Sequence, residues 1–450
     1  MNFHELNNHK AWVVAVEMGY GHQRAAYPLK EIAYGGKIIN ANSYPGIPSK
    51  DRKIWRQSRE FYEFISRFSH VPLIGQPTFK LYDRLQAIPD FYPKRDLSHS
   101  TIQLDQMIRL IKKGWGKNLI RKLEKKHLPL VTTFFVPAFM ADIHDYNGDI
   151  YCVVCDADIS RTWVPPNPAK SRINYFAPCY RVVERLKLYG VKSERIFLTG
   201  FPLPLENLGD TINLNTLKHD LAFRLRNLDP KNFYISKYQE IICSQLGLRK
   251  LPEKSDHLLT ITFAIGGAGA QRELGLEIVN SLRKEIINKK IRIILVAGIH
   301  NDINQFFKKN IKEMGLGGQL NRGIKIVFAQ NKEDYFRKFN KALRTTDILW
   351  TKPSELSFYS ALGLPIIMSS PIGSQEKFNR KWLLAIGAGV DQENIRYTNE
   401  WLFDWLNSGW FAEAAMEGYF EVPKYGTYNI AKVVSKKVKE VKEMKPVLLY

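Results

Sequence analysis

Short apolar runs followed by turns and helical segments constrain this chain more than any other feature of its sequence. The first run, 12–16, leads into a turn containing Gly19 and Gly21 and then into helix-forming residues. Further runs occur at 37–41, 130–135 and 151–155, with longer segments of helical period between them. This alternation predicts a parallel sheet with crossover helices, so we expect an α/β fold for the first half of the chain.

The same rhythm restarts after a polar, mostly helical stretch. Strand candidates at 258–265, 292–297, 324–328, 348–350 and 365–368 predict a second α/β domain. A length of 450 residues fits two large domains. We therefore expect two Rossmann-like, doubly wound domains facing a cleft: a first domain over 1–205, a helical linker or insertion over 206–256, a second domain over 257–430, and a basic C-terminal helix or tail over 431–450.

The net charge and the cysteine content indicate which binding partners and which cellular compartment to expect. Lys and Arg number 66 against 44 Asp and Glu, a net charge of +22, which favours polyanionic partners or anionic membrane surfaces. The CxxC of Cys152 and Cys155 lies in an apolar run, which predicts buried thiols rather than a zinc or redox site. The first ten residues lack a secretory pattern, and no apolar run reaches the ~20 residues that span a bilayer. We expect a cytoplasmic protein whose membrane contact is at most peripheral.

A glycine-rich turn follows the first strand of the second domain. The segment 263–272 ends an apolar run with Gly266, Gly267 and Gly269 and then opens a helix near Arg272. Glycines allow backbone N–H groups to approach a phosphate, and a helix N-terminus adds partial positive charge. Arg272 would add a charge-assisted contact. The alternative is a turn that uses glycine only for tight packing.

Two more polar loops follow strands of the second domain. One contains Lys352, Ser354, Glu355 and Ser357, and the other continues through 369–379. Side-chain amides and carboxylates in the second loop, at Gln375, Glu376 and Asn379, suit the hydroxyl groups of a polyhydroxylated ligand.

Together these loops resemble the two-domain GT-B glycosyltransferases, specifically the family of the peptidoglycan N-acetylglucosaminyltransferase and the monogalactosyl- and diglucosyl-diacylglycerol synthases. In the first half, the resemblance is carried by Gly19-Tyr20-Gly21-His22 with Ala25-Ala26, Cys155-Asp156-Ala157-Asp158, Trp163-Val164-Pro165-Pro166 and 195–202. In the second half, it is carried by Gly266-Gly267-Ala268-Gly269, Thr351-Lys352-Pro353, 361–365, and Gly373-Ser374-Gln375-Glu376 with Asn379. The resemblance covers most of the chain, and the order and spacing of its pieces are specific.

The resemblance implies transfer of a sugar from a UDP-sugar, with inversion at the anomeric carbon and without a bound metal or other cofactor. The nucleotide-sugar is then a substrate that lies mainly on the second domain. Carried over by position, the three glycines would face the diphosphate, residues 352–357 would line the nucleotide-sugar, and Gln375, Glu376 and Asn379 would contact sugar hydroxyls. Gly19 and Gly21 would belong to the acceptor loop, and His22 would reach across the cleft.

The chemistry expected of His22 is removal of the proton from the attacking acceptor hydroxyl. An imidazole with a pKa near 6.5 can take that proton at neutral pH. The alternative is a structural, hydrogen-bonded loop histidine. Asp156 and Asp158 are further candidates for the base, and their alternative role is to cap the turn after a strand.

One departure from the family pattern bears on the donor. Where the family commonly has a Glu that binds the ribose hydroxyls, this chain has Ser360, and a hydroxyl cannot accept from two donors as a carboxylate does. Glu355, where relatives usually have a small residue, would be a replacement. The departure keeps open a GT-B scaffold that binds a nucleotide-sugar or glycan without turnover. A nucleic-acid-binding protein is a third reading, prompted by the charge, but no recognisable nucleic-acid module accompanies it.

A basic and aromatic segment suggests the acceptor. Residues 109–127 contain eight Lys or Arg and one Glu, interleaved with Trp115 and several aliphatic residues. Such a segment can lie in the interface of an anionic membrane, which predicts a lipid or other membrane-surface acceptor. The alternative is an ordinary surface helix that covers the first domain. The aromatic residues of 52–92 are either part of an acceptor-binding insertion or core.

Overall fold

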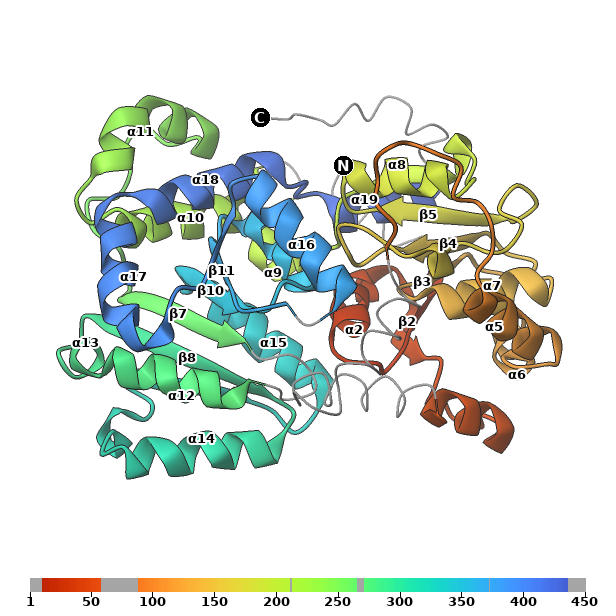
Figure 1. Ribbon diagram of the computed structural model, residues 1–450, viewed down its shortest axis with the longest axis horizontal. Helices are drawn as coiled ribbons and strands as arrows, with labels where there is room; N and C mark the ends of the chain where they lie inside the picture. The colour runs from red at the N-terminus through yellow and green to blue at the C-terminus, as the bar shows by residue number, and fades with distance from the viewer. Residues whose placement is uncertain (1–9, 58–87, 211–212, 265–270, 372, 436–450) are drawn as a thin grey trace. The chain divides into compact units, whose positions relative to one another are not determined.

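The computed structural model describes residues 10–57, 88–210, 213–264, 271–371 and 373–435 of the chain. The chain divides into two compact units, of which the first contains residues 1–203, 372–379 and 425–449 and the second contains residues 204–371 and 380–424 (Figure 1). The predicted glycine turn of the second domain and the basic tail beyond residue 435 lie outside the described residues.

The first unit is built on a sheet of six parallel strands, in the order β2-β1-β3-β4-β5-β6. The chain places β2 on one side of β1 and then returns to add β3 to β6 on the other side. The point between β1 and β3, where the direction reverses, is a topological switch point. The strands are β1 (Ala11–Ala15), β2 (Ala33–Asn40), β3 (Leu130–Thr132), β4 (Ile150–Val153), β5 (Ile173–Ala177) and β6 (Ile196–Leu198).

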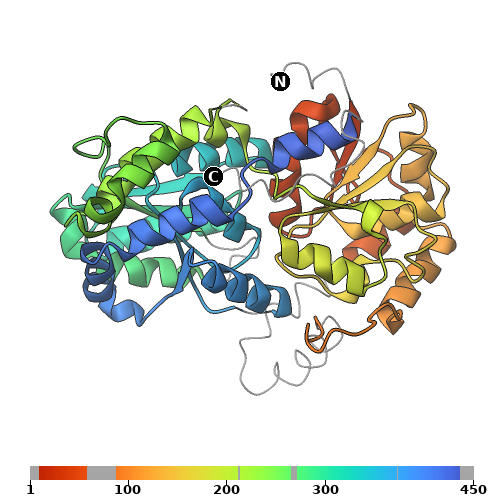
Figure 2. The ribbon, with the colours of Figure 1, turned by 90° about the horizontal axis from the view of Figure 1, so that it is seen from above.

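Helices lie on both faces of this sheet (Figures 1 and 2), which is why β1, β3 and β4 are nearly continuous apolar runs. The helical elements of this unit are α2 (Gly21–Ala26), η1 (Tyr27–Ile32), α5 (Ile102–Lys112), α6 (Lys117–Leu123), α7 (Phe135–Ile143), η2 (Arg161–Trp163), α8 (Tyr180–Leu188), η3 (Ser193–Arg195) and α19 (Gly426–Val434).

The basic segment 109–127 forms parts of α5 and α6, and its apolar face belongs to the core. The side chains of Ile111, Leu119 and Ile120 are at most 2% exposed, and Trp115 packs against Trp55 with ring centroids 4.9 Å apart. These apolar side chains are therefore not available to a membrane interface, and the segment is a surface helix pair. Its basic side chains remain exposed, at Arg109, Lys112, Lys113, Lys117, Arg121, Lys125 and Lys126.

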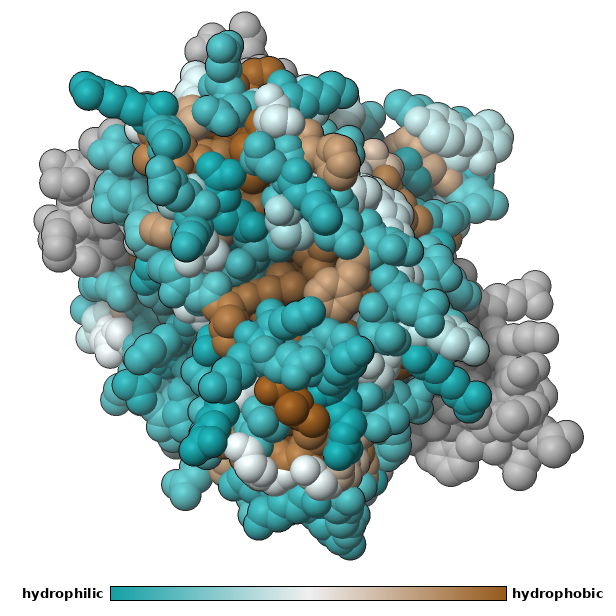
Figure 3. All heavy atoms as spheres, turned by 90° about the vertical axis from the view of Figure 1, so that its left-hand side faces the viewer, coloured by the Kyte–Doolittle hydropathy of each residue, from teal (hydrophilic) through white to brown (hydrophobic). Residues whose placement is uncertain are grey.

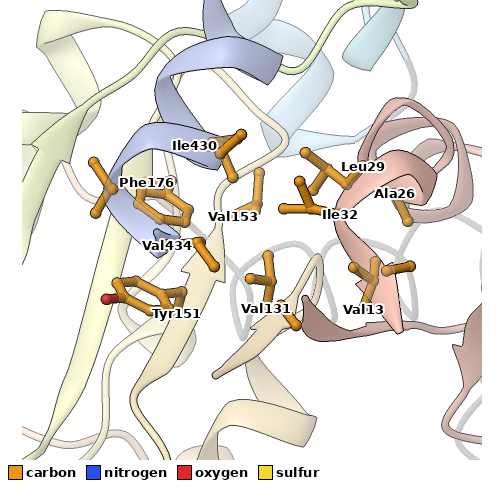
Figure 4. Packing of buried hydrophobic residues seen from close by; sticks show 14 of the residues in the cluster. Val13, Ala26, Leu29, Ile32, Val131, Tyr151, Val153, Phe176, Ile430 and Val434 are labelled. Carbon is orange, nitrogen blue, oxygen red and sulfur yellow. The ribbon is translucent and has the colours of Figure 1, made fainter. Parts of the chain in front are cut away.

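Helix α19 completes the core of the first unit from the far end of the chain. Ile430 and Val434 pack with Val13 of β1, Leu29 of η1 and Phe176 of β5 (Figure 4). Figure 2 shows the blue α19 beside the red N-terminal elements. The structure thus differs from the predicted boundary at 430. The apolar spacing of this segment signals a buried helix face, but it does not say which core buries that face.

The second unit has its own six-stranded parallel sheet, in the order β12-β11-β10-β7-β8-β9. The chain runs outward from β7 to β9 and then returns to lay β10 to β12 on the other side of β7. This is the strand order of a Rossmann fold, with a switch point between β7 and β10. The strands are β7 (Leu259–Ala264), β8 (Ile291–Gly298), β9 (Ile324–Phe328), β10 (Ile348–Thr351), β11 (Ile366–Met368) and β12 (Gly389–Asp391).

The stretch predicted as a linker is fastened to the second unit. Arg224 of α10 is buried and donates hydrogen bonds to the carbonyl oxygens of Thr346 (2.7 Å), Leu362 (2.6 Å) and Gly363 (3.3 Å). The helical elements are α9 (Leu205–Leu208), α10 (Asn215–Leu228), α11 (Phe233–Leu246), α12 (Arg272–Ser281), α13 (Arg283–Ile287), α14 (Asn301–Glu313), η4 (Gly317–Gln319), α15 (Lys332–Leu343), η5 (Glu355–Leu362), α16 (Ser374–Ala385), η6 (Ile395–Tyr397), α17 (Thr398–Asn407) and α18 (Trp410–Glu421).

The fold class predicted from the sequence, two Rossmann-like α/β units, is confirmed by the two sheets. The four cysteines are buried and free, as predicted, and burial raises the pKa of Cys179 to about 12. The face of the second unit seen in Figure 3 is mostly hydrophilic, with smaller hydrophobic patches. Among the described residues, no helix is both long enough and apolar enough to cross a bilayer.

Candidate functional site

The loop that carries His22 follows β1 at the switch point of the first unit. Asn42 fixes its start, because the Glu17 backbone N–H donates to Asn42 Oδ1 (3.0 Å) and Asn42 Nδ2 donates to the Glu17 carbonyl oxygen (3.4 Å). Gly19 then takes a φ of +90°, a conformation that favours glycine. The chain enters α2 at Gly21, so His22 lies in the first turn of that helix.

The imidazole of His22 is held by the first residue after β3. Its Nδ1 lies 2.7 Å from the carbonyl oxygen of Thr133, and Thr133 Oγ1 donates to the carbonyl oxygen of His22 at 2.7 Å. Since a carbonyl oxygen can only accept, Nδ1 carries the proton of the neutral ring. The lone pair of this tautomer is on Nε2, so Nε2 is the nitrogen that can accept a proton.

Aromatic side chains surround this imidazole. The ring centroid of Phe134 lies 4.7 Å from that of His22, and the ring centroid of Trp163 lies 6.2 Å from it. Phe135 joins the cluster, 4.4 Å from Phe134 and 5.1 Å from Trp163. Sequence reasoning did not include Phe134 or Phe135 among the functional residues, although two consecutive aromatics directly after a strand were a usable signal.

Asp156 lies in the loop after β4, the strand that neighbours β3 in the sheet. Asn379 holds Asp156 in this position. Asn379 is fully buried, its Nδ2 donates to Asp156 Oδ1 (3.0 Å), and its Oδ1 accepts from the backbone N–H of Ala157 (2.7 Å). The Cys155 thiol, one residue before Asp156, donates to the Thr133 carbonyl oxygen (3.5 Å). The same oxygen accepts the hydrogen bond from His22 Nδ1. The predicted contact of Asn379 with sugar hydroxyls gives way to a positioning role, because both ends of its amide are bonded to this loop.

Asp158 is a structural residue and not a base. Its buried carboxylate accepts from Arg185 Nε (2.7 Å) and Nη2 (2.9 Å), and also from Arg181 Nε (3.1 Å) and the backbone N–H of Ile159 (2.9 Å). Its side chain is 1% exposed and that of Arg185 is 0% exposed. Four donors occupy both oxygens, so Asp158 anchors α8 to the loop after β4 and is removed from the candidate bases.

Three strands of the second unit, each followed by a candidate loop in the sequence, end together at one edge of its sheet. Thr351 of β10 pairs in register with Ala264 of β7 on one side and with Met368 of β11 on the other, so these three strands end together. Thr351 Oγ1 donates to the Ala264 carbonyl oxygen (3.0 Å), and Ser369 Oγ donates to Gln271 Oε1 (3.1 Å). The carboxyl ends of β7, β10 and β11 therefore lie side by side at the switch point.

Gly266, Gly267 and Gly269 lie outside the described residues, so their contact with a diphosphate stays a prediction. Arg272 begins α12 directly after that turn, and its Nε donates to Glu273 Oε1 (3.0 Å). Its guanidinium also lies 4.4 Å from the ring centroid of Phe306 on α14. The same side chain remains partly exposed at the N-terminus of α12.

The loop after β10 contains Lys352, Ser354, Glu355 and Ser357. Lys352, Ser354 and Glu355 are half-buried at this edge, and Glu355 begins η5. Ser357 is fully buried, and its hydroxyl has no hydrogen-bond partner within the described part of the chain. Gln375 and Glu376 occupy the first turn of α16, after the third loop.

Ser360 does not face a ligand in this arrangement. Its buried hydroxyl donates to the carbonyl oxygen of Ser357 (2.8 Å). Its own carbonyl oxygen lies against Gly418 of α18, where an added Cβ would approach to 2.5 Å. Ser360 therefore serves the packing of η5 against α18. No group of three or more His, Cys, Asp or Glu side chains within the described ranges is arranged to hold a metal ion.

Comparisons with known proteins give one family and several solved structures. The family described as "Domain of unknown function (DUF6938)" matches residues 249–438. No curated protein sequence matches the chain.

Three solved structures are similar to the chain over most of its length. MurG of Acinetobacter baumannii has 11% identity over 95% of this chain and 99% of that one, with a TM-score of 0.47. The S. aureus MnaA–UDP co-structure has 11% identity over 96% and 98% and a TM-score of 0.45. Arabidopsis thaliana UGT89C1 complexed with UDP-L-rhamnose has 12% identity over 95% and 92% and a TM-score of 0.44. Scores below 0.5 carry no argument, so the fold assignment rests on the two sheets.

Proposed function

We propose that this chain is an inverting, metal-independent glycosyltransferase that moves a sugar from a UDP-sugar to a hydroxyl group of a lipid or other membrane-surface acceptor. The observation that carries the proposal is the His22 imidazole at the switch point of the first unit, with Nδ1 committed to Thr133 and Nε2 left as the basic nitrogen. The sequence resemblance to GT-B glycosyltransferases supports the same role for this histidine.

In the proposed reaction His22 acts as the general base. Nε2 takes the proton of the acceptor hydroxyl as its oxygen attacks the anomeric carbon of the donor sugar, and the bond from that carbon to the diphosphate oxygen breaks. Attack from the face opposite the leaving diphosphate inverts the anomeric centre. Thr133 keeps the ring in the productive tautomer, and Asn379 holds Asp156 in the loop after β4, at the same edge of the sheet.

The donor is proposed to bind at the edge where β7, β10 and β11 end. Backbone N–H groups at the start of α12 and the positive end of that ten-residue helix would receive the diphosphate. Lys352, Ser354 and Glu355 lie on the neighbouring loop, where they would contact the nucleotide-sugar. Charge neutralisation by backbone and helix would take the part that a cation has in metal-dependent transferases.

The exposed basic side chains on and beside α5 and α6 support the proposal that the protein binds and acts at an anionic membrane surface. Seven exposed Lys or Arg side chains lie on these two helices or directly after one of them, between Arg109 and Lys126. Each basic residue near an anionic bilayer contributes about 1 kcal/mol of attraction. The proposed location is cytoplasmic, on the inner face of a membrane.

A nucleotide-sugar-binding scaffold without turnover is the second candidate, because Ser360 stands where the family has a ribose-binding carboxylate and is buried against α18. Both candidates predict nucleotide binding, and only the first predicts chemistry. A thermal-shift panel of UDP-, GDP- and dTDP-sugars would identify the donor class through binding linkage.

The deciding experiment compares His22→Ala with the matched surface variant His127→Ala in a donor-turnover assay. Loss of a general base should lower turnover by about 10²–10⁴-fold. The thermal shift caused by the donor should stay the same, because His22 belongs to the first unit, whereas the start of α12 and the loop after β10 belong to the second. Unchanged turnover in His22→Ala would remove this histidine as the base. Donor binding without turnover in the unmodified protein would favour the scaffold.

A further inference from the structure

Phe134 and Phe135 are large aromatic side chains that the first unit leaves half-buried beside His22. Both follow β3 directly, at the sheet edge where functional loops gather. Their neighbours in the same cluster are buried, since Phe139 is 1% exposed and Trp163 is 4% exposed. The partly open rings are therefore the outer wall of an aromatic cluster whose inner members belong to the core.

The position of this wall limits what can carry the reacting hydroxyl. A hydroxyl that donates to Nε2 has its oxygen about 2.6–3.2 Å from that nitrogen, and its carbon is one covalent bond further. The Phe134 centroid is only 4.7 Å from the centre of the imidazole. Phe134 is therefore one of the side chains close enough to line the space beside the imidazole.

The chemistry and the tilt of these rings distinguish between a polyhydroxylated and an apolar carbon skeleton next to the reacting hydroxyl. Phe134 and Phe135 are inclined by 44°, Phe135 and Trp163 by 53°, and Phe134 and Trp163 by 81°. A free sugar carries further hydroxyl groups beside the reacting one, and two phenyl rings offer those hydroxyls no ordinary hydrogen-bond partner. Tilted rings instead meet an apolar group on several sides, in the edge and face contacts that aromatic clusters favour.

We propose that Phe134 and Phe135 form an acceptor subsite that selects an alcohol whose carbinol carbon bears an apolar group, aliphatic or aryl, and that disfavours a free sugar. The subsite rests on the proposed function for the role of His22. It specifies the part of the acceptor next to the reacting oxygen, which the basic surface of α5 and α6 does not address.

The test uses 4-fluorobenzyl alcohol as the apolar probe and 2-deoxy-2-fluoroglucose as the polyhydroxylated one, each followed by ligand-observed ¹⁹F NMR on the full chain. The aryl alcohol should broaden with the unmodified protein and with Phe233→Ala, a matched control whose ring is 64% exposed on the second unit. Broadening should be lost in Phe134→Ala and in Phe135→Ala. Two variants are used so that one of them still tests the subsite if the other does not fold. Circular dichroism would show whether each variant is folded.

Equal broadening of the aryl alcohol by Phe134→Ala and the unmodified protein would overturn the subsite. Equal broadening of the fluorosugar and the aryl alcohol would overturn the apolar selectivity. The readout needs no turnover, so it separates this proposal from the catalytic one. If donor turnover is absent while the Phe134-dependent broadening persists, the transferase proposal fails and the subsite stands. In an active protein, Phe134→Ala should raise the KM of an apolar acceptor about 10-fold or more.

Discussion

Replacing Asp158 and Asp156 in turn tests whether Asp158 stabilises the fold while Asp156, in the same loop after β4, does not. Asp158→Asn removes the charge that faces the fully buried Arg185 and turns one accepting oxygen into a donating amide. Breaking a buried ion pair from one side typically costs about 3–5 kcal/mol, because the remaining charge is left uncompensated. Asp156 is half-buried, and its Oδ1 accepts from the neutral amide of Asn379. Asp156→Asn keeps an oxygen that can accept from Asn379 and leaves no fully buried partner charge there, so it should cost less than Asp158→Asn.

Thermal and urea unfolding of the two variants would measure this contrast. For a unit of about 200 residues, 3–5 kcal/mol corresponds to a fall of roughly 6–20 °C in Tm. Arg185→Met should be destabilising alone. The double variant with Asp158→Leu should recover part of the loss, because an apolar pair leaves no buried charge. Equal destabilisation by Asp158→Asn and Asp156→Asn, or a change within about 0.5 kcal/mol for Asp158→Asn, would refute the assignment of Asp158 as the anchor.

Two further predictions concern the core of the first unit and a histidine of the second. Ile430→Ala should destabilise the protein by about 2–5 kcal/mol, because Ile430 is fully buried in the cluster that α19 completes, whereas Lys432→Ala on the same helix should have little effect. An equal loss of Tm in both variants would contradict the packing role. His257 lies with Nδ1 2.5 Å from Asp256 Oδ1 and Nε2 3.2 Å from Asp347 Oδ1. Burial lowers its pKa, but the two carboxylates outweigh burial and raise the pKa above 6.5. Its stabilisation is then fully present below about pH 6.5 and is lost as pH rises through the folded-state value. The Tm advantage of the unmodified protein over His257→Gln should therefore shrink with rising pH, and an advantage that grows would contradict the pairing.

Most strands were predictable from short apolar runs. The predicted run 324–328 coincides with β9, and the runs at 12–16, 151–155 and 258–265 each meet a strand within one or two residues. Strands β5, β6 and β12 were not predicted. β6 and β12 each have three residues at an edge of their sheet, where hydrophobic periodicity gives too few positions to detect, and Asn174 interrupts the apolar residues of β5.

The candidate site was predictable only in part, because the type of a side chain does not show which partners the fold brings to it. His22 was indicated by the glycine turn before it. Thr133 was not, since its carbonyl oxygen binds the imidazole and every residue has such an oxygen. Asp156 and Asp158 were equivalent in the sequence, and only the contact with Arg185, 27 residues further along the chain, separates them.

The return of residues 425–434 to the first unit affects how this protein is made. On the ribosome, the polypeptide releases the strands β1 to β6 first, yet Ile430 and Val434 of their core emerge only after the whole second unit has been synthesised. A fragment ending at Leu203 would expose the apolar surface that α19 covers. The first unit cannot complete its core until residues 425–434 have been synthesised, so its apolar surface depends on chaperone protection for longer than the order of its strands suggests.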